Sequence, residues 1–246
     1  RWLSKKNYKN VLACRMHRFE LDRHYDEIQW NNIDSVLFIS EAMERKFHAK
    51  GDYKGKTFVT YDNLNFEDFP LIQKEKTMQI GMLGNIEPRK GVLEFVEHFG
   101  KMNLPEIKLS IAGKAKDATY YGKIKRHIVE NNLESKITIE GYVKDLNDWY
   151  NSNDCIISNS VYEGTQTSIV EGVATGCWAI SKDWDGAEEI VDEKGLFTDI
   201  NELEKCINLF YKWNDQEKNK NINKARERLI SKLASRPRMH DIILKL

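Results

Sequence analysis

The sequence has few prolines and cysteines, no surplus of either charge and no long hydrophobic run. Four prolines and 14 glycines in 246 residues exclude a collagen-like or low-complexity chain. The 38 basic and 38 acidic side chains cancel, so the basic surplus typical of nucleic-acid-binding proteins is missing. No stretch approaches the ~18 consecutive apolar residues of a membrane-spanning helix, and residues 1–10 lack the apolar core of a signal peptide. We therefore expect a globular cytoplasmic protein that does not bind nucleic acid.

The cysteines and histidines show no metal-ligand spacing. Cys14, Cys155 and Cys177 each lie in an apolar run, which favours buried, reduced thiols. The histidines at positions 24, 48, 98, 127 and 240 form no cluster that would indicate zinc. No metal site is expected.

Short apolar runs alternate with helical segments from about residue 77 onward. Val92, Phe95, Val96 and Phe99 recur at the spacing of one helix face. Strict alternation of strand and helix implies right-handed crossovers and a parallel sheet covered on both faces. The sequence therefore predicts a doubly wound, Rossmann-like α/β domain with strands over residues 77–83, 107–112, 136–140, 154–158 and 178–181.

The first 65 residues repeat this pattern on a smaller scale. Strands are expected at 10–15, 35–39 and 58–61, and a helix capped by Ser40 follows the second of them. These elements amount to about half of a Rossmann-like domain. The predicted organisation is a partial domain over 1–65, a linker over 66–77, the main domain over 78–214 and a helical segment over 215–246.

Two loops carry side chains suited to a nucleotide. In the loop that follows the strand at 154–158, Glu163 could accept hydrogen bonds from sugar hydroxyls, and Glu171 could accept them from a ribose diol. Between these two residues, small hydroxyl residues open a helix whose amides could hold a phosphate. The alternative is that two glutamates eight residues apart occur by chance in a protein rich in acidic residues.

The second loop with side chains suited to a nucleotide covers residues 84–91. Gly84 permits close approach of a ligand to the backbone. Arg89 and Lys90 open the next helix, whose positive dipole end repels them unless an anion is shared. A nucleotide diphosphate would explain this arrangement, and an exposed basic turn is the alternative.

In order and spacing, the motifs over residues 78–210 resemble a known family. They look like the donor-binding domain of retaining nucleotide-sugar glycosyltransferases of the two-Rossmann (GT-B) type, in the Glu-x7-Glu group (glycosyl transferases group 1, family 4). The motifs that carry the resemblance are Gly84-x3-Pro-Arg-Lys-Gly91, Ile111-Ala-Gly113, Ile139-Glu-Gly141-Tyr-Val143, Ser160-x2-Glu163-Gly164, Glu171 and Asp185-Gly-Ala-Glu188.

The resemblance implies a role for each matching residue. Glu163 contacts the transferred sugar, Glu171 the ribose and Lys90 the diphosphate. The family usually has an arginine where this chain has Asn85, and Arg89 beside Lys90 is expected to replace it in part. The implied donor site comprises Gly84, Asn85, Arg89, Lys90, Gly141, Tyr142, Val143, Glu163, Gly164, Thr165, Gln166, Thr167, Ser168 and Glu171.

Residues 1–65 resemble the end of the acceptor-side domain of the same enzymes. His17 follows a strand where the family often has a histidine that reaches the cleft, so it joins Lys90 and Glu163 as a candidate catalytic residue. The alternative is a histidine satisfied within a turn. The family's earlier βα units do not occur in the sequence, so a missing N-terminal segment, a second copy or another chain is expected to cover this half domain.

The implied reaction moves a sugar from a UDP- or GDP-linked donor to an acceptor hydroxyl, with retention of configuration and without metal or cofactor. The implied acceptor is a glycan, a lipid-linked saccharide or a protein in surface polysaccharide or glycoconjugate synthesis, with peripheral contact at the inner membrane face as one option. Asp183-Trp-Asp185 matches the metal motif of a different glycosyltransferase fold, and we assign it no metal. Two alternatives remain: a nucleotide-sugar-binding module without turnover, and a sugar-nucleotide epimerase.

Overall fold

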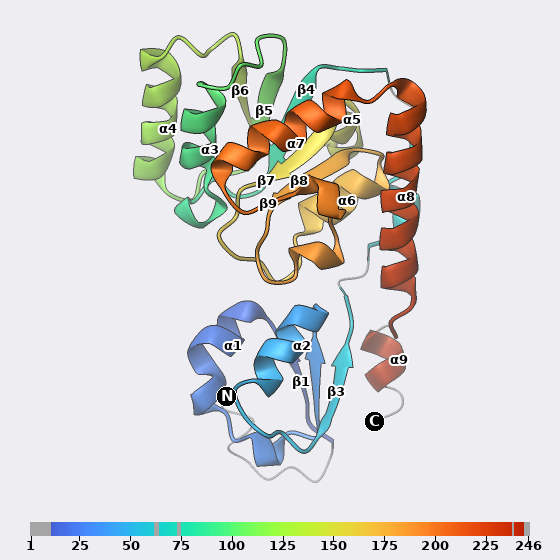
Figure 1. Ribbon diagram of the computed structural model, residues 1–246. Coiled ribbons are helices and arrows are strands. Elements are labelled where there is room, and N and C mark those ends of the chain that lie inside the picture. The colour runs from blue at the N-terminus through green and yellow to red at the C-terminus, as the bar shows by residue number, and fades with distance from the viewer. Residues whose placement is uncertain (1–10, 62–63, 73–74, 238, 244–246) are drawn as a thin grey trace. The chain divides into compact units, whose positions relative to one another are not determined.

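The computed structural model describes residues 11–61, 64–72, 75–237 and 239–243 (Figure 1). The chain forms two compact units, the first comprising 1–63, 163–165 and 230–246, and the second 64–162 and 166–229. This division differs from the predicted segments in that 163–165 and 230–246 group with the first unit. The predicted strand residue Asn10 and the pair Asp62-Asn63 before the linker lie outside the described residues.

The first unit contains a three-stranded parallel sheet in the order β1-β2-β3. Ser40 caps α2 through its hydroxyl, which accepts a hydrogen bond from the Met43 amide at 3.3 Å. The strands lie within three residues of their predicted bounds. The elements are β1 (Ala13–Met16), α1 (Arg18–His24), β2 (Ser35–Phe38), α2 (Glu41–His48), β3 (Lys56–Val59) and α9 (Met239–Ile243).

Aromatic side chains form much of the core of the first unit. Phe47 of α2 is fully buried and contacts the rings of Phe38, Tyr25 and Trp30. Cys14 is only half-buried, so the prediction of a buried thiol is wrong at this position. The reason is that, among the described residues, β1 lies at the edge of the sheet and has a neighbouring strand on one side only. Its burial is still sufficient to raise the pKa of the thiol.

The second unit contains a six-stranded, all-parallel sheet in the order β6-β5-β4-β7-β8-β9. The chain builds outward from β4 in one direction and then in the other, so the order reverses between β4 and β7. This doubly wound order confirms the predicted fold class, and it places the ligand crevice at the carboxyl ends of these two strands. The strands are β4 (Gln79–Leu83), β5 (Lys108–Ala112), β6 (Ile137–Gly141), β7 (Cys155–Ser158), β8 (Trp178–Lys182) and β9 (Leu196–Phe197).

Helices cover both faces of this sheet (Figure 1). They are α3 (Val92–Phe99), α4 (Ala118–Glu130), α5 (Leu146–Asn151), α6 (Thr167–Ala174), α7 (Ile200–Lys212) and α8 (Asp215–Ala234). Short 3-10 turns occur at Tyr25–Glu27, Trp30–Asn32, Phe66–Asp68, Pro88–Lys90, Ala187–Glu189 and Glu193–Gly195. No helix in the described part of the chain combines the length and apolar character that crossing a bilayer requires.

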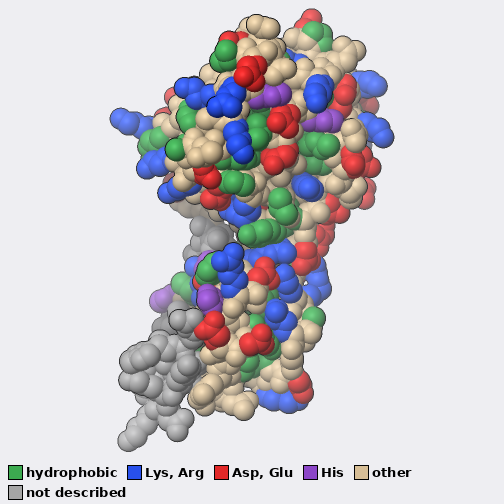
Figure 2. Space-filling view, turned by 90° about the vertical axis from the view of Figure 1, so that its left-hand side faces the viewer, with side chains coloured by type: hydrophobic (Ala, Val, Ile, Leu, Met, Phe, Trp, Pro, Cys, Tyr) green, Lys and Arg blue, Asp and Glu red, His purple; other side chains and the backbone are tan. Residues whose placement is uncertain are grey.

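The core of the second unit joins apolar residues from the strands and from α3, α4 and α7. Trp213 packs against buried Trp178 with ring centroids 4.9 Å apart. Trp149 is also buried, and its indole N–H donates to Ser110 Oγ at 3.0 Å. Both Trp149 and Trp213 therefore pack in the core. On the face that carries α3 and α4, acidic and basic side chains intermix (Figure 2).

Asp154 anchors the segment before β4 to the rest of the second unit. Its buried carboxylate accepts hydrogen bonds from the Thr77 and Met78 amides and from the Tyr211 hydroxyl, all at 2.9 Å. Burial raises the pKa of Tyr211, which keeps this hydroxyl a donor. Asp154→Ala leaves three donors without an acceptor, and we expect it to lower the free energy of unfolding by about 2–4 kcal/mol.

Urea unfolding measures this loss, with Tyr211→Phe as the matched variant. Tyr211→Phe removes only one of the three hydrogen bonds and is expected to cost about 1 kcal/mol. Equal losses in the two variants would show that the Thr77 and Met78 amides do not depend on Asp154.

Candidate functional site

The loops that follow β4 and β5 are joined through their backbones at the carboxyl end of the sheet. The Gly84 amide donates to Ala112 O at 3.0 Å, and the Ile86 amide donates to Lys114 O at 2.9 Å. Gly113 has φ +139°, and a Cβ there would lie 1.8 Å from Gly84 O. Only glycine fits at position 113, which gives the Ile-Ala-Gly motif a physical reason.

A small pocket opens above these loops, at the point where the strand order reverses. Gly84, Asn85, Lys90 and Gln166, which were all predicted as donor-site residues, line it together with residues 158–160. The half-buried Lys90 side chain lies along Gly84, with its Nζ 3.8 Å from the position that a Cβ there would occupy. The structure therefore brings together residues from the first loop and from the loop before α6.

Two buried polar atoms in this pocket have no hydrogen-bond partner within the described part of the chain. They are Ser160 Oγ, on a residue that is 1% exposed, and Gln166 Oε1, on a residue that is 5% exposed. Buried polar groups in proteins are almost always paired, so a bound polar ligand is a natural partner for both. Gln166 also precedes α6, whose first turn is not capped by a side chain, which leaves its amides to face an anion.

Glu171 lies one turn inside α6 and is held by α5. Its Oε2 accepts a hydrogen bond from the Tyr150 hydroxyl at 2.7 Å. Burial raises the pKa of this carboxyl group, and the hydrogen bond from Tyr150 opposes the rise. A carboxylate placed in this way can accept hydrogen bonds from hydroxyl groups of a ligand.

Arg89 links the first loop to the segment before Glu163. Its Nη1 donates to Tyr162 O at 3.1 Å, its Nη2 contacts Glu87 Oε1 at 2.8 Å, and its guanidinium lies 5.5 Å from the Tyr162 ring centroid. The Val161 amide also donates to Arg89 O at 3.0 Å. These contacts give Arg89 a role in holding the two loops together, and the expectation that it also contacts a donor stays a prediction.

Gly141 ends β6, Tyr142 and Val143 follow it, and none of the three lines this pocket. Gly141 O accepts a hydrogen bond from the Gly113 amide at 2.6 Å. Tyr142 is 66% exposed, and Lys114 Nζ lies 4.7 Å from the centroid of its ring. An exposed aromatic ring at the carboxyl edge of the sheet is available to a ligand.

Of the remaining predicted residues, Thr167 and Ser168 begin α6 in the second unit, and the other four lie in the first unit. Glu163 is buried, and its carbonyl accepts a hydrogen bond from Arg18 Nη1 at 3.1 Å. Thr165 Oγ1 donates to Ile39 O at 2.6 Å, and the space for a Cβ at Gly164 is filled by Ile39. His17 is exposed and precedes α1, where its carbonyl accepts from the Leu21 amide.

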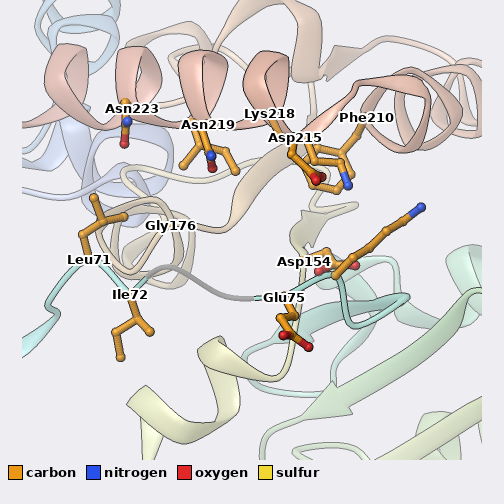
Figure 3. Close-up of a pocket in the computed structure, with 12 residues that line it drawn as sticks. Leu71, Ile72, Glu75, Asp154, Gly176, Phe210, Asp215, Lys218, Asn219 and Asn223 are labelled. Carbon is orange, nitrogen blue, oxygen red and sulfur yellow. The ribbon is translucent and has the colours of Figure 1, made fainter.

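A larger cavity in the second unit is lined by none of the predicted site residues. It measures about 600 Å³ and lies between residues 71–72 and 75–76 on one side and α8 on the other (Figure 3). Asp154 and Gly176, which line it, precede β7 and β8, so it lies at the amino ends of the strands. In parallel sheets, ligands bind at the carboxyl ends, so we place the functional site at the smaller pocket. Within the described residues, no cluster of His, Cys, Asp and Glu could hold a metal ion.

Several residues of the site were not among those predicted. Ser160 and Asn159 line the pocket, and Asn159 Nδ2 donates to Gly91 O at 2.8 Å. Tyr150 contacts Glu171 from another helix. Ser160 belongs to the motif Ser160-x2-Glu163-Gly164, and this motif indicates that Ser160 lies near the site. Nothing in the sequence around Tyr150 indicates its contact with Glu171.

The reversed strand order and the pocket at the carboxyl ends define a doubly wound ligand-binding domain. The sequence profile of the family described as glycosyl transferases group 1 matches residues 77–211, more than half of the chain. The chain belongs to this family.

Relatives of known structure or name agree with this assignment. The chain is 26% identical over 187 residues to the poly(glycerol-phosphate) alpha-glucosyltransferase of Bacillus subtilis (strain 168), an alignment that covers 72% of the chain but only 27% of that protein's length. HepE of Anabaena, solved with UDP and glucose, superposes with a TM-score of 0.76 at 18% identity, over 97% of the chain and 72% of HepE. A variant of TarM of S. aureus, solved with Fondaparinux, alpha-GlcNAc-glycerol and UDP, superposes with a TM-score of 0.78 at 21% identity. This superposition covers 94% of the chain and 50% of TarM. The fold is thus that of GT-B glycosyltransferases.

Proposed function

We propose that this chain carries the donor-binding part of a retaining glycosyltransferase, which transfers a sugar from a UDP- or GDP-linked donor to an acceptor hydroxyl. The observation that carries the proposal is the pocket beside Lys90, where the buried atoms Ser160 Oγ and Gln166 Oε1 have no partner among the described residues. A nucleotide diphosphate matches a cation, an uncapped helix start and polar groups in one pocket.

Each residue has a role in the proposed reaction. As the bond from the anomeric carbon to the diphosphate breaks, the carbon gains oxocarbenium character and negative charge grows on the leaving phosphate. Lys90 and the first amides of α6 stabilise that charge, so no metal or cofactor is required by the proposal. Glu171 holds the ribose, Glu163 orients the sugar and His17 serves the acceptor side. The new bond forms to the acceptor oxygen on the face that the diphosphate leaves, and the leaving phosphate takes the acceptor's proton.

We infer that the acceptor is a hydroxyl of a surface polysaccharide or glycoconjugate. The support is the name of the Bacillus relative, which acts on poly(glycerol phosphate), and the complex of TarM with alpha-GlcNAc-glycerol. In this proposal the polymer is assembled at the cytoplasmic face of the membrane, and the protein reaches it there by peripheral contact.

Thermal unfolding in the presence of UDP, GDP, UDP-glucose and GDP-mannose tests donor binding. A ligand at about 100 times its Kd adds about 2.7 kcal/mol to stability. For a protein of this size that corresponds to a rise in Tm of roughly 5–10 °C. One nucleotide family should raise Tm and the other should not, and absence of any shift would contradict the proposal.

Product analysis separates the transferase from the two alternatives. With the preferred donor and glycerol phosphate or a glycan as acceptor, we expect release of the nucleoside diphosphate and an α-linked product from an α-linked donor. Binding without any release would favour a non-catalytic module. Conversion of the donor to its epimer without acceptor would favour an epimerase.

A further inference from the structure

We propose that Tyr150 is a positioning residue of the donor site: its hydroxyl holds one oxygen of the Glu171 carboxylate and turns the other toward the ribose. The inference rests on the proposed function, because it assigns to Glu171 the contact with the donor ribose. Tyr150 lies on α5 and Glu171 on α6, so the contact joins two helices that are separate in sequence.

The surroundings of Tyr150 leave its ring one position. The residue is fully buried, the Phe69 ring packs against its ring in a T-shaped arrangement with centroids 6.3 Å apart, and a Cβ on Gly172 would lie 3.3 Å from Tyr150 Cε1. The hydroxyl lies 2.7 Å from Glu171 Oε2 and 3.2 Å from Ser168 O. The shorter contact has the charged acceptor, so the proton points to the carboxylate. Because the Tyr150 ring cannot move, its hydroxyl also holds the Glu171 carboxylate in one position.

The same hydrogen bond helps to keep Glu171 ionised. Burial raises the pKa of the carboxyl group, and the Tyr150 hydroxyl is the group that lowers it. Cys177 is a further titratable group near Tyr150, and its thiol donates to Tyr150 O at 3.3 Å. Loss of the hydroxyl therefore raises the pKa of Glu171 further, and the carboxylate becomes protonated at a higher pH than in the wild type.

The chain offers a matched control in Tyr120. This buried tyrosine donates to Glu94 Oε2 at 3.0 Å and accepts from the Leu93 amide, and it joins α4 to α3. Tyr120→Phe removes a tyrosine–glutamate hydrogen bond of the same kind in the same unit. The Tyr120 hydroxyl also accepts from the amide of Val92, which lines the pocket, but it contacts neither Glu171 nor Tyr150. A general effect of losing such a bond will appear in both variants, whereas an effect on the ribose will appear only in Tyr150→Phe.

The test compares nucleotides with and without ribose hydroxyls. UDP, GDP and their 2′,3′-dideoxy forms are titrated calorimetrically into the wild type, Tyr150→Phe and Tyr120→Phe between about pH 5 and pH 8. The two forms of one nucleotide share their phosphates, so the ratio of their Kd values cancels phosphate titration. We expect Tyr150→Phe to reduce the preference for the ribose form roughly tenfold. As the pH is lowered, this preference should disappear at a higher pH in Tyr150→Phe than in the wild type. Tyr120→Phe should match the wild type.

Glu171→Gln is a second variant that keeps Tyr150 and cannot ionise. It should reduce the preference for the ribose form and abolish the pH dependence of the ratio; a dependence that persists would overturn the proposal. An unchanged ratio in Tyr150→Phe, or equal weakening of both forms, would also overturn it. A wild type that binds neither UDP nor GDP refutes the proposed function instead, and the role of Tyr150 falls with it.

Discussion

Gly113→Ala is expected to destabilise the second unit by about 3–5 kcal/mol, which lowers Tm by roughly 6–20 °C in a protein of this size. The added methyl group would lie 1.8 Å from Gly84 O, and the backbone at φ +139° does not suit an L side chain. To relieve the overlap, the two loops must separate. That movement breaks the hydrogen bonds between the Gly84 amide and Ala112 O and between the Gly113 amide and Gly141 O.

Gly122→Ala is the matched control for Gly113→Ala and should have the opposite sign. Gly122 lies in the middle of α4, where an added Cβ meets no atom within 4 Å. Alanine there removes the entropic penalty of a helical glycine and should add about 0.5–1 kcal/mol. Thermal unfolding of the two variants beside the wild type measures both effects. If Gly113→Ala has the same Tm as the wild type, the loops after β4 and β5 are not joined as closely as described.

The order of elements in the second unit could be predicted because each strand is a short segment rich in apolar residues that ends in glycine or a polar loop; in β6 the apolar residues Ile137 and Ile139 alternate with polar ones. This regularity held for the five strands from β4 to β8. It failed for β9, which has two residues, Leu196 and Phe197, and no run to detect. The half-burial of Cys14 was missed for a related reason: an apolar sequence does not reveal whether a strand lies at a sheet edge.

The site could be predicted only where neighbours in sequence are also neighbours in the pocket. Lys90 and Gln166 each follow a strand, and parallel topology brings such loops to one edge, so both line the pocket. The contact between Tyr150 and Glu171 depends on how two helices pack, which no spacing in the sequence encodes. The same limit applies to Arg89, whose contacts with Glu87 and Tyr162 become visible only when the loops are folded.

Lys90→Met is expected to weaken nucleotide diphosphate binding roughly 100-fold, because it removes the ammonium group from the pocket and keeps the aliphatic stem. At a concentration of about 100 times the wild-type Kd, the ligand then adds only about 0.4 instead of about 2.7 kcal/mol, so the thermal shift almost vanishes. Calorimetric titration with UDP and GDP gives the change in Kd directly. Lys90→Arg keeps the charge and should retain most of the affinity.

The rate of transfer should fall more than the affinity, because negative charge on the leaving phosphate grows as the sugar bond breaks. A hydrogen-bond donor that is directed at the charge developing in the transition state contributes roughly 100- to 1000-fold to kcat. Lys123→Met, which removes a lysine from the exposed side of α4, controls for the change in net charge and should leave both Kd and kcat at wild-type values. Equal losses in Lys90→Met and Lys123→Met would point to a long-range charge effect. A loss confined to Lys90→Met, larger in kcat than in Kd, would instead place its ammonium group at the leaving phosphate.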